Sequence, residues 1–255
     1  MEKVYLLGMS LNTGSYNEFV SKIIEHADRK SSEYTCVANV HMLIEAYSDY
    51  NFAKVVNNAN IITPDGKPLS WALHFLYGIR QERAAGMDLL PDLLHNADSH
   101  KLPVYFYGGS QQLLDKTLVY LQENYPGLVV AGSKSPPFSK DAPVDDNDIV
   151  EEINRSGAQL VFVVLGCPKQ EKWMASMKGR INAMMVGIGG ALPVLIGTQR
   201  RAPGWMQNAG LEWMFRFLQE PVRLFRRYSF TNSLFLYLLL KEYVWLKFFK
   251  GAANV

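Results

Sequence analysis

Apolar and polar residues alternate along the first 190 residues in a way that predicts strands and helices in turn. Short apolar runs bounded by turn residues are typical of buried strands, and longer stretches with helical spacing lie between them. The predicted strands are 4–7, 35–38, 60–63, 104–107, 128–131, 160–165 and 183–186. The predicted helices are 16–28, 41–47, 52–58, 69–77, 87–98, 111–124, 149–156 and 169–177. This alternation predicts an α/β fold, a Rossmann-like and largely parallel sheet flanked by helices.

The pattern changes at about residue 192, where only helical spacing continues. Pro203 and Pro221 divide this part into pieces, and Pro221 is typical of a first helical turn. We therefore predict an α/β core at 1–191 and a helical appendage at 192–255. The last piece, 230–250, mixes Leu, Phe, Tyr and Trp with lysines, which resembles an amphipathic helix lying on a membrane surface. A helix packed on the core or on another subunit gives the same pattern, so a homo-oligomer stays open.

Composition and charge change the picture in one respect. The chain has 255 residues, 48% apolar and 20% charged, which is an ordinary globular balance. Two cysteines, Cys36 and Cys167, are too few for a disulfide framework, and we see neither a signal peptide nor a spanning apolar run of about 18 residues. We therefore expect a cytoplasmic protein. From Arg200 onward, however, nine Lys and Arg stand against three Glu, so the appendage is predicted to meet something anionic.

The loops that follow the predicted strands hold the candidate binding residues, because ligands of open α/β sheets bind beyond the carboxyl ends of the strands. Glycine-rich turns suit phosphate groups, since their backbone N–H groups can approach a ligand closely. Asn39 follows one strand and offers a neutral hydrogen-bonding group. The other candidates on these loops are Gly108, Gly109, Lys169, Gln170, Gly187, Gly189 and Gly190.

The stretch Thr63-Pro64-Asp65-Gly66 places an acid at a strand-to-helix turn. Pro64 fixes its φ angle and Gly66 permits unusual angles, so the turn holds Asp65 rigidly. A helix cap or an Asx-turn explains such an acid structurally. A general base that removes a proton from an acceptor hydroxyl is the functional explanation. Arg83 is similarly either an anion clamp or a member of a surface ion pair.

Several common signatures are missing or weak. There is no GxxxxGK[ST] sequence, and "GIGGAL" lacks the GxGxxG spacing of dinucleotide sites. "DDND" at 145–148 contains the DxD spacing of some metal-dependent glycosyltransferases, but its place before a helical run favours capping. Histidines and cysteines show no metal-ligand spacing. Cys167 has no nearby sign of a base that would make it a nucleophile.

Eight stretches together resemble one family. They are "ANVHMLIEAY…NNANIITPDGKPLSWAL…RAAGMDLLPDLL", "VYFYGGS", "YPGLVVAGS", "LGCPKQEKW", "VGIGGA" and "RRAPGWMQNAGLEWMFRFLQEPVRLFRRY". In order and spacing this combination is similar to the WecG/TagA/CpsF glycosyltransferases over about residues 4–228. The resemblance implies a bacterial enzyme on the inner face of the cell membrane. Such enzymes transfer a sugar from a UDP-sugar to an undecaprenyl-diphosphate-linked sugar during cell-surface polysaccharide synthesis.

The resemblance also implies roles for individual residues. The reaction inverts the anomeric carbon without a metal ion or other cofactor, and Asp65 is the implied base. Asn39, Arg83 and Gln170 are implied to line the sugar and diphosphate pocket. The implied anion-binding residues of the appendage, which also meets the anionic membrane, are Arg200, Arg201, Arg223, Arg226 and Arg227. Pro193 stands where many members carry an acid, so the donor sugar is not assigned.

Two other functions stay open at this point. A dinucleotide-dependent epimerase or oxidoreductase needs a better GxGxxG and a ribose-binding acid about 20 residues later. A non-catalytic, membrane-docked module that binds nucleotide sugars needs no base. Nucleic acid is not an expected partner, because the basic residues of the appendage alternate with large apolar ones.

Overall fold

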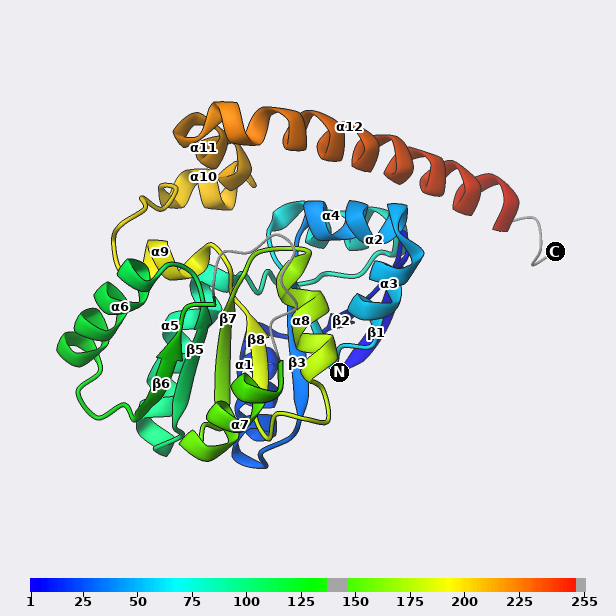
Figure 1. The fold of residues 1–255 in the computed structure, drawn as a ribbon. Coiled ribbons are helices and arrows are strands. Elements are labelled where there is room, and N and C mark those ends of the chain that lie inside the picture. Colours follow the sequence, from blue (N-terminus) through cyan, green and yellow to red (C-terminus); the bar gives the residue numbers. More distant parts are fainter. Residues whose placement is uncertain (137–145, 251–255) are drawn as a thin grey trace.

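The computed structural model describes residues 1–136 and 146–250 and contains a six-stranded parallel sheet (Figure 1). The strand order is β4-β3-β8-β7-β5-β6, and every neighbouring pair is parallel. The bounds are β3 Glu33–Ala38, β4 Ile61–Pro64, β5 Val104–Gly108, β6 Val130–Lys134, β7 Leu160–Val164 and β8 Met184–Gly187. The predicted α/β class and parallel sheet are therefore confirmed.

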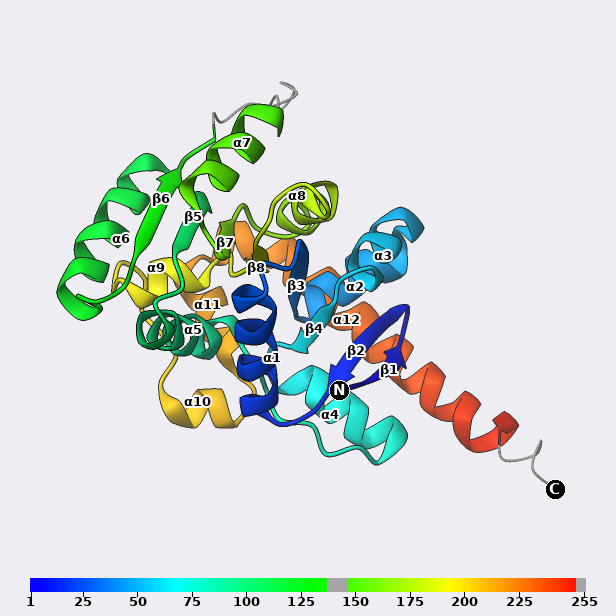
Figure 2. The same cartoon turned by 90° about the horizontal axis from the view of Figure 1, so that it is seen from below.

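Helices cover both faces of this sheet (Figure 2). One face carries α2 (Val40–Ser48), α3 (Tyr50–Asn57), α7 (Asp146–Ser156) and α8 (Lys169–Met177). The other face carries α1 (Tyr16–Asp28), α5 (Gly86–His100) and α6 (Gln111–Asn124), while α4 (Lys67–Tyr77) lies beyond β4. Because both faces are covered, the central strands β7 and β8 are apolar throughout, and all five residues of β7 are buried.

One predicted strand lies elsewhere. Residues 4–7 were expected in the main sheet, but β1 (Glu2–Leu6) pairs only with β2 (Met9–Thr13), in an antiparallel hairpin. The hairpin turns tightly at Leu7 and Gly8, which both have positive φ angles. Its Asn12 side chain accepts a hydrogen bond from the Ile62 amide at 2.8 Å. The hairpin thus covers the β4 edge of the sheet, which would otherwise expose unpaired backbone groups.

After β8 the described chain is entirely helical. The helices are α9 (Ala191–Leu195), α10 (Gly204–Asn208), α11 (Glu212–Gln219), α12 (Pro221–Trp245) and the π-helical turn η1 (Leu246–Lys250). As expected, α10 begins after Pro203 and Pro221 opens α12. The helices α10, α11 and α12 lie on the side of the carboxyl ends of the strands, at the top of Figure 1. No described helix has the length and apolar character needed to cross a membrane. The predicted division at residue 191 stays a prediction.

The appendage packs on the core through apolar side chains and one glycine turn. On α12, Phe235 and Leu238 are buried in the same cluster as residues of α2. The rings of Phe75 and Tyr243 stack with their centroids 4.5 Å apart. Gly210 has a φ of +68° and lies so close to the Trp71 indole that a β-carbon would come within 2.6 Å of it. The appendage therefore rests on α2 and α4, the helices that follow β3 and β4.

Candidate functional site

The sequence candidates Asn39, Asp65 and Gly190 follow three neighbouring strands, β3, β4 and β8. Carboxyl ends of parallel strands share one edge of the sheet, so the residues that follow them are brought together. The backbone amide of Asp65 donates to the Ala38 carbonyl at 2.6 Å, which extends the β3–β4 pairing by one residue. Asp65 is therefore fixed to the end of the sheet.

The Asn39 side chain has two functions in this corner. Its Oδ1 accepts a hydrogen bond from the Met42 amide at 3.1 Å and caps the N-terminus of α2. The same side chain also hydrogen bonds to Asp65. Because Oδ1 is used as the cap, the Nδ2 group is the donor toward the Asp65 carboxylate. Asn39 was predicted to offer a neutral hydrogen-bonding group at this edge of the sheet. In the structure its partners are the Met42 amide and the Asp65 carboxylate.

Asp65 is held in a poorly hydrated position. Although the residue keeps some contact with solvent, the surrounding groups remove most of its hydration, and this burial raises the pKa of Asp65 from 3.8 to about 6. The Glu212 carboxylate raises the pKa further. Three groups oppose the rise, namely Arg216, Arg83 and the hydrogen bond from Asn39. The result is a carboxylate that is charged at neutral pH but has a pKa close to it, as a general base requires.

Arg216 on α11 is a site residue that the sequence analysis missed. It is the strongest charge that opposes the raised pKa of Asp65. Its Nη1 lies 3.7 Å from the position that a β-carbon on Gly190 would occupy. No carboxylate of the described chain lies within ion-pair distance of it. The structure thus places a cation between the Asp65 turn and the glycine turn that follows β8.

Arg83 lies beside Asp65, but both its terminal nitrogens are already paired. Nη1 is 2.5 Å from Glu212 of α11 and Nη2 is 2.7 Å from Asp88 of α5. Asp88 also pairs with Arg201, from the segment between α9 and α10. The ion-pair alternative for Arg83 is therefore what the structure shows. Through these contacts Arg83 joins the core to the appendage directly next to the candidate base.

One protein-family model matches nearly the whole chain. The family model described as glycosyl transferase WecG/TagA/CpsF matches residues 4–248. The chain belongs to this glycosyltransferase family.

Two curated relatives carry the same printed name, N-acetylglucosaminyldiphosphoundecaprenol N-acetyl-beta-D-mannosaminyltransferase. The protein of Bacillus spizizenii is 31% identical over 213 residues, which cover 83% of this chain and 81% of the relative. The protein of Bacillus subtilis is 29% identical over 220 residues, which cover 86% of this chain and 83% of the relative. Membership in a family of transferases argues against the dinucleotide-dependent enzyme and the non-catalytic module.

In this glycosyltransferase Gln170 is not available to a ligand in the way the resemblance implied. The residue is 5% exposed. Its Oε1 accepts from the Gly166 amide at 3.1 Å, and its Nε2 donates to Glu171 at 2.7 Å. Lys169 next to it is exposed. The buried Gln170 side chain therefore contacts the loops after β7 and β8 from inside the protein. Lys169, the first residue of α8, faces solvent instead.

The glycines at the strand ends of the transferase are required first for close packing. Gly108 has a φ of +108°, and a β-carbon there would lie 2.6 Å from the Val164 carbonyl oxygen. Gly109 has a φ of +76°. A β-carbon on Gly187 would lie 2.9 Å from Gln170 Nε2. Gly190, by contrast, is exposed beside Arg216, so it is the glycine with the clearest access to a ligand.

The predicted arginines of the appendage separate into different groups. Arg200 and Arg226 are exposed, and Arg223 pairs with Glu220 at 2.5 Å. Arg227 lies over the Tyr228 ring, and its Nε is buried without a hydrogen-bond partner among the described residues. Burial and the charge of Arg227 lower the pKa of His41 on α2 to about 4. Of the five predicted arginines, Arg201 pairs with Asp88 of the core, and Arg227 lies close enough to α2 for its charge to affect His41.

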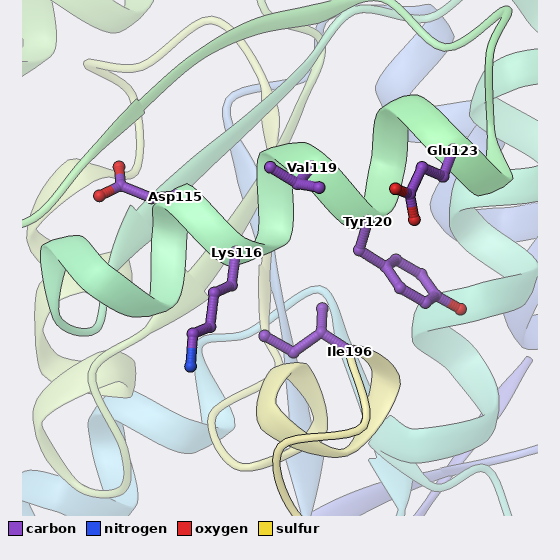
Figure 3. Close-up of a pocket in the computed structure, with 6 residues that line it drawn as sticks. All are labelled: Asp115, Lys116, Val119, Tyr120, Glu123 and Ile196. Carbon is purple, nitrogen blue, oxygen red and sulfur yellow. The ribbon is translucent and has the colours of Figure 1, made fainter.

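Two surface cavities lie near these elements. A polar one of about 530 Å³ is lined by Arg83, Asp88 and Arg201, and also by Tyr16, Lys67, Glu82, Met87, Pro91, Asp92 and Asn208. The second, of about 400 Å³, lies between α6 and the end of α9 (Figure 3). It is lined by Asp115, Lys116, Val119, Tyr120, Glu123 and Ile196, none of which is a sequence candidate. The first cavity therefore adjoins the site, and the second does not.

Within residues 1–136 and 146–250, no group of three His, Cys, Asp or Glu side chains is placed to hold a metal ion. α7 begins at Asp146, within the acidic stretch at 145–148, whose first residue lies outside the described residues, so its capping role stays a prediction. Burial raises the pKa of the Cys167 thiol, so Cys167 is not an activated nucleophile.

Proposed function

We propose that this glycosyltransferase moves a sugar from a UDP-sugar to a saccharide linked to undecaprenyl diphosphate, for bacterial cell-surface polysaccharide synthesis. The aligned part of this chain covers more than four fifths of the length of each of the two relatives. Their printed name describes transfer to N-acetylglucosaminyldiphosphoundecaprenol. The observation that carries the proposal is the position of Arg216 near Asp65, at the end of β4, where the charge of Arg216 opposes the raised pKa of Asp65 although the two side chains form no ion pair. It puts a candidate base near a cation that also lies beside the exposed Gly190.

The proposed reaction is a single in-line displacement. The Asp65 carboxylate accepts the proton of an acceptor hydroxyl as its oxygen attacks the anomeric carbon of the donor sugar. The bond between that carbon and the diphosphate oxygen breaks, and its electron pair leaves with UDP. Attack from the face opposite UDP inverts the anomeric configuration. Arg216, near the exposed Gly190, stabilises the negative charge that grows on the diphosphate.

We propose further that arginine side chains perform the charge stabilisation without a metal ion. The support is the position of Arg216, whose guanidinium has no ion-pair partner among the residues described and so keeps its charge for a ligand. Arg227 is the proposed second cation, since its buried Nε lacks a partner in the described structure. It would meet the diphosphate of the acceptor.

The first prediction is release of UDP in the presence of both substrates. Purified protein is incubated with a panel of UDP-sugars and a short-chain lipid-diphosphate N-acetylglucosamine, with and without EDTA. We expect UDP release that requires the acceptor and is unchanged by EDTA. Glucose-linked lipid diphosphate serves as the comparison acceptor. Failure of every donor to give acceptor-dependent UDP release would refute the proposed reaction, and loss of activity in EDTA would refute metal independence.

A membrane surface is the third proposed partner. The outward side of the C-terminal half of α12 exposes a run of large apolar residues, Leu236, Tyr237, Leu240, Val244 and Trp245. Lys241 on the same half and Lys247 on the following turn η1 are exposed. Apolar and aromatic residues flanked by lysines suit the headgroup region of an anionic bilayer. The location on the inner membrane face follows from this proposal.

The second prediction concerns this face of α12. The substitution Leu240→Glu should weaken binding to vesicles containing anionic lipid by about tenfold or more, because it removes about 1.5–3 kcal/mol of apolar burial and adds repulsion. Val119→Glu, on the exposed part of α6, is the matched control and should bind as the unchanged protein does. Co-sedimentation at two salt concentrations measures the effect. Equal binding by both variants would contradict the assignment of α12.

A further inference from the structure

Glu171 is an acid in an unusual place. It lies in the first turn of α8 and is 0% exposed, whereas glutamate is almost never fully buried without a partner. One carboxyl oxygen accepts a hydrogen bond from Gln170 Nε2 at 2.7 Å, and the Cys167 side chain also hydrogen bonds to the carboxyl group. The other oxygen, Oε2, is buried without a partner in the described structure. The roles proposed above for Asp65 and the arginines leave this acid unexplained.

The main neighbour of Glu171 is the Gln170 amide, which touches two loops at once. Gln170 Oε1 accepts from the Gly166 amide, in the loop after β7. The same amide group packs against the loop after β8. A β-carbon on Gly187 would lie 2.9 Å from its Nε2, and one on Gly189 would lie 3.2 Å from its Oε1. One planar amide therefore fixes the spacing between two neighbouring loops of the site.

Together with the Gly166 N–H, Glu171 favours one orientation of the Gln170 side-chain amide. A carboxyl group accepts hydrogen bonds, so its contact with Gln170 Nε2 leaves Oε1 to face the Gly166 N–H. If the amide turned over, its NH₂ group would meet the Gly166 N–H, and two donors would face each other. Without an acceptor at position 171, nothing at this end of the amide favours the observed orientation. The loops after β7 and β8 would then lose their common support.

We propose that Glu171 is a positioning residue, which acts through Gln170 to hold the glycine turn at 189–190 in place for the departing diphosphate. The inference rests on the proposed function, in which Arg216 and Gly190 meet that diphosphate. Glu171 itself touches no substrate. Burial raises the pKa of Glu171, and an uncharged carboxyl group still accepts the Gln170 hydrogen bond. The role therefore requires an acceptor oxygen at this position and does not require a negative charge.

The third prediction compares Glu171→Leu with Glu171→Gln. Leucine removes the acceptor at nearly constant size and should lower kcat by about tenfold or more, with a similar loss of UDP affinity and little change in the KM for the acceptor. Glutamine keeps an acceptor oxygen and should stay within about threefold of the unchanged protein. Leucine removes a buried carboxyl group but also leaves the buried Gln170 Nε2 without its acceptor, so the melting temperature is measured beside kcat to confirm that the variant is folded at the assay temperature. Glu151→Leu, exposed on α7, is the control and should leave kcat unchanged.

A double-mutant cycle with Gln170→Leu tests whether Glu171 acts through Gln170. In that background, adding Glu171→Leu should cause no further loss of kcat. Fully additive losses would overturn the proposal, and so would unchanged kcat in Glu171→Leu. A Glu171→Gln variant as slow as Glu171→Leu would show that the charge is needed, which also contradicts it.

Hydrogen exchange separates this inference from the proposed reaction. In the substrate-free protein, the Gly166 amide should be protected from exchange in the unchanged protein and in Glu171→Gln, and should exchange faster in Glu171→Leu. This readout needs no turnover. If no UDP release is found but the exchange pattern holds, the proposed reaction is refuted. The role of Glu171 in orienting Gln170 against the Gly166 loop is then still supported. Equal exchange in all three proteins would refute the positioning role.

Discussion

Replacing Asp65 by asparagine is expected to lower kcat by about 10²- to 10⁴-fold, the usual contribution of general acid–base catalysis. Asparagine has the same shape and keeps the hydrogen bond to Asn39 within reach, but it cannot accept a proton from the acceptor hydroxyl. UDP affinity should change little, since the carboxylate does not contact the diphosphate in the proposed reaction. Acceptor-dependent UDP release measures kcat, and calorimetric titration measures UDP binding.

The pH profile gives this prediction a second readout. A base must be deprotonated, and burial raises the pKa of Asp65 to about 6. Below pH 6, kcat/KM of the unchanged enzyme should therefore fall tenfold for each pH unit, and Asp65→Asn should lack this limb. The raised pKa means that the folded state binds this proton more tightly than the unfolded state does. The Asp65 contribution to stability consequently improves as pH falls from above 6 toward 3.8, so Asp65→Asn should melt no lower than the unchanged protein at pH 8.

Unimpaired sugar transfer by Asp65→Asn would remove Asp65 from the mechanism. The neighbouring control is Asn39→Ala, which removes the α2 cap and the hydrogen bond to Asp65 together. It should cost about 1 kcal/mol of stability as well as activity. The two variants therefore differ in melting temperature even if both are slow, so a folding defect is not mistaken for loss of the base.

Breaking the Arg83–Glu212 ion pair is expected to cause the largest loss of stability among the polar substitutions considered. The two side chains are 14% and 19% exposed, so either partner left alone keeps a poorly hydrated charge. Arg83→Met should lower the free energy of unfolding by about 3 kcal/mol. Glu212→Gln in the Arg83→Met background should recover part of that loss. Urea unfolding of the two single variants and the double variant measures the coupling energy.

The exposed pair Arg155–Glu151 on α7 is the matched control for that cycle. Its side chains are 78% and 62% exposed, so the same substitutions there should change the free energy of unfolding by less than about 1 kcal/mol. A coupling energy for Arg83 and Glu212 as small as the control value would show that this ion pair does not hold the appendage on the core.

Much of the fold could be predicted because the sheet is buried on both faces. Strands such as β5 and β7 must then be short apolar runs, which stand out between helical stretches. The predicted bounds of α1 and α6 agree with the structure, since Ser15 and Ser110 cap them with their side chains. β2 was missed because Ser10, Asn12 and Thr13 interrupt its apolar residues. Its Asn12 is buried against the sheet edge, which no local pattern indicates.

The site could be predicted only where it depends on topology. Asn39 and Asp65 follow adjacent strands, so a parallel sheet brings them together. The partners that come from the appendage had no such signal. Glu212 reaches Arg83 across 129 residues of sequence, and Arg216 reaches the glycine turn only because α11 lies over the strand ends. Gln170 looked like a ligand-facing residue because it follows a strand, but its side chain turns inward to Glu171.

The order of residues along the chain has a consequence for biosynthesis. Asp65 leaves the ribosome with the early strands, whereas Arg216 follows only after the last strand, β8, has been made. In the proposed mechanism, a nascent chain would carry the proton acceptor long before the guanidinium that stabilises the leaving group, and it could not transfer sugar during that interval. Because α12 is translated after Arg216, the proposed lipid-binding side would be made at the same late stage of synthesis.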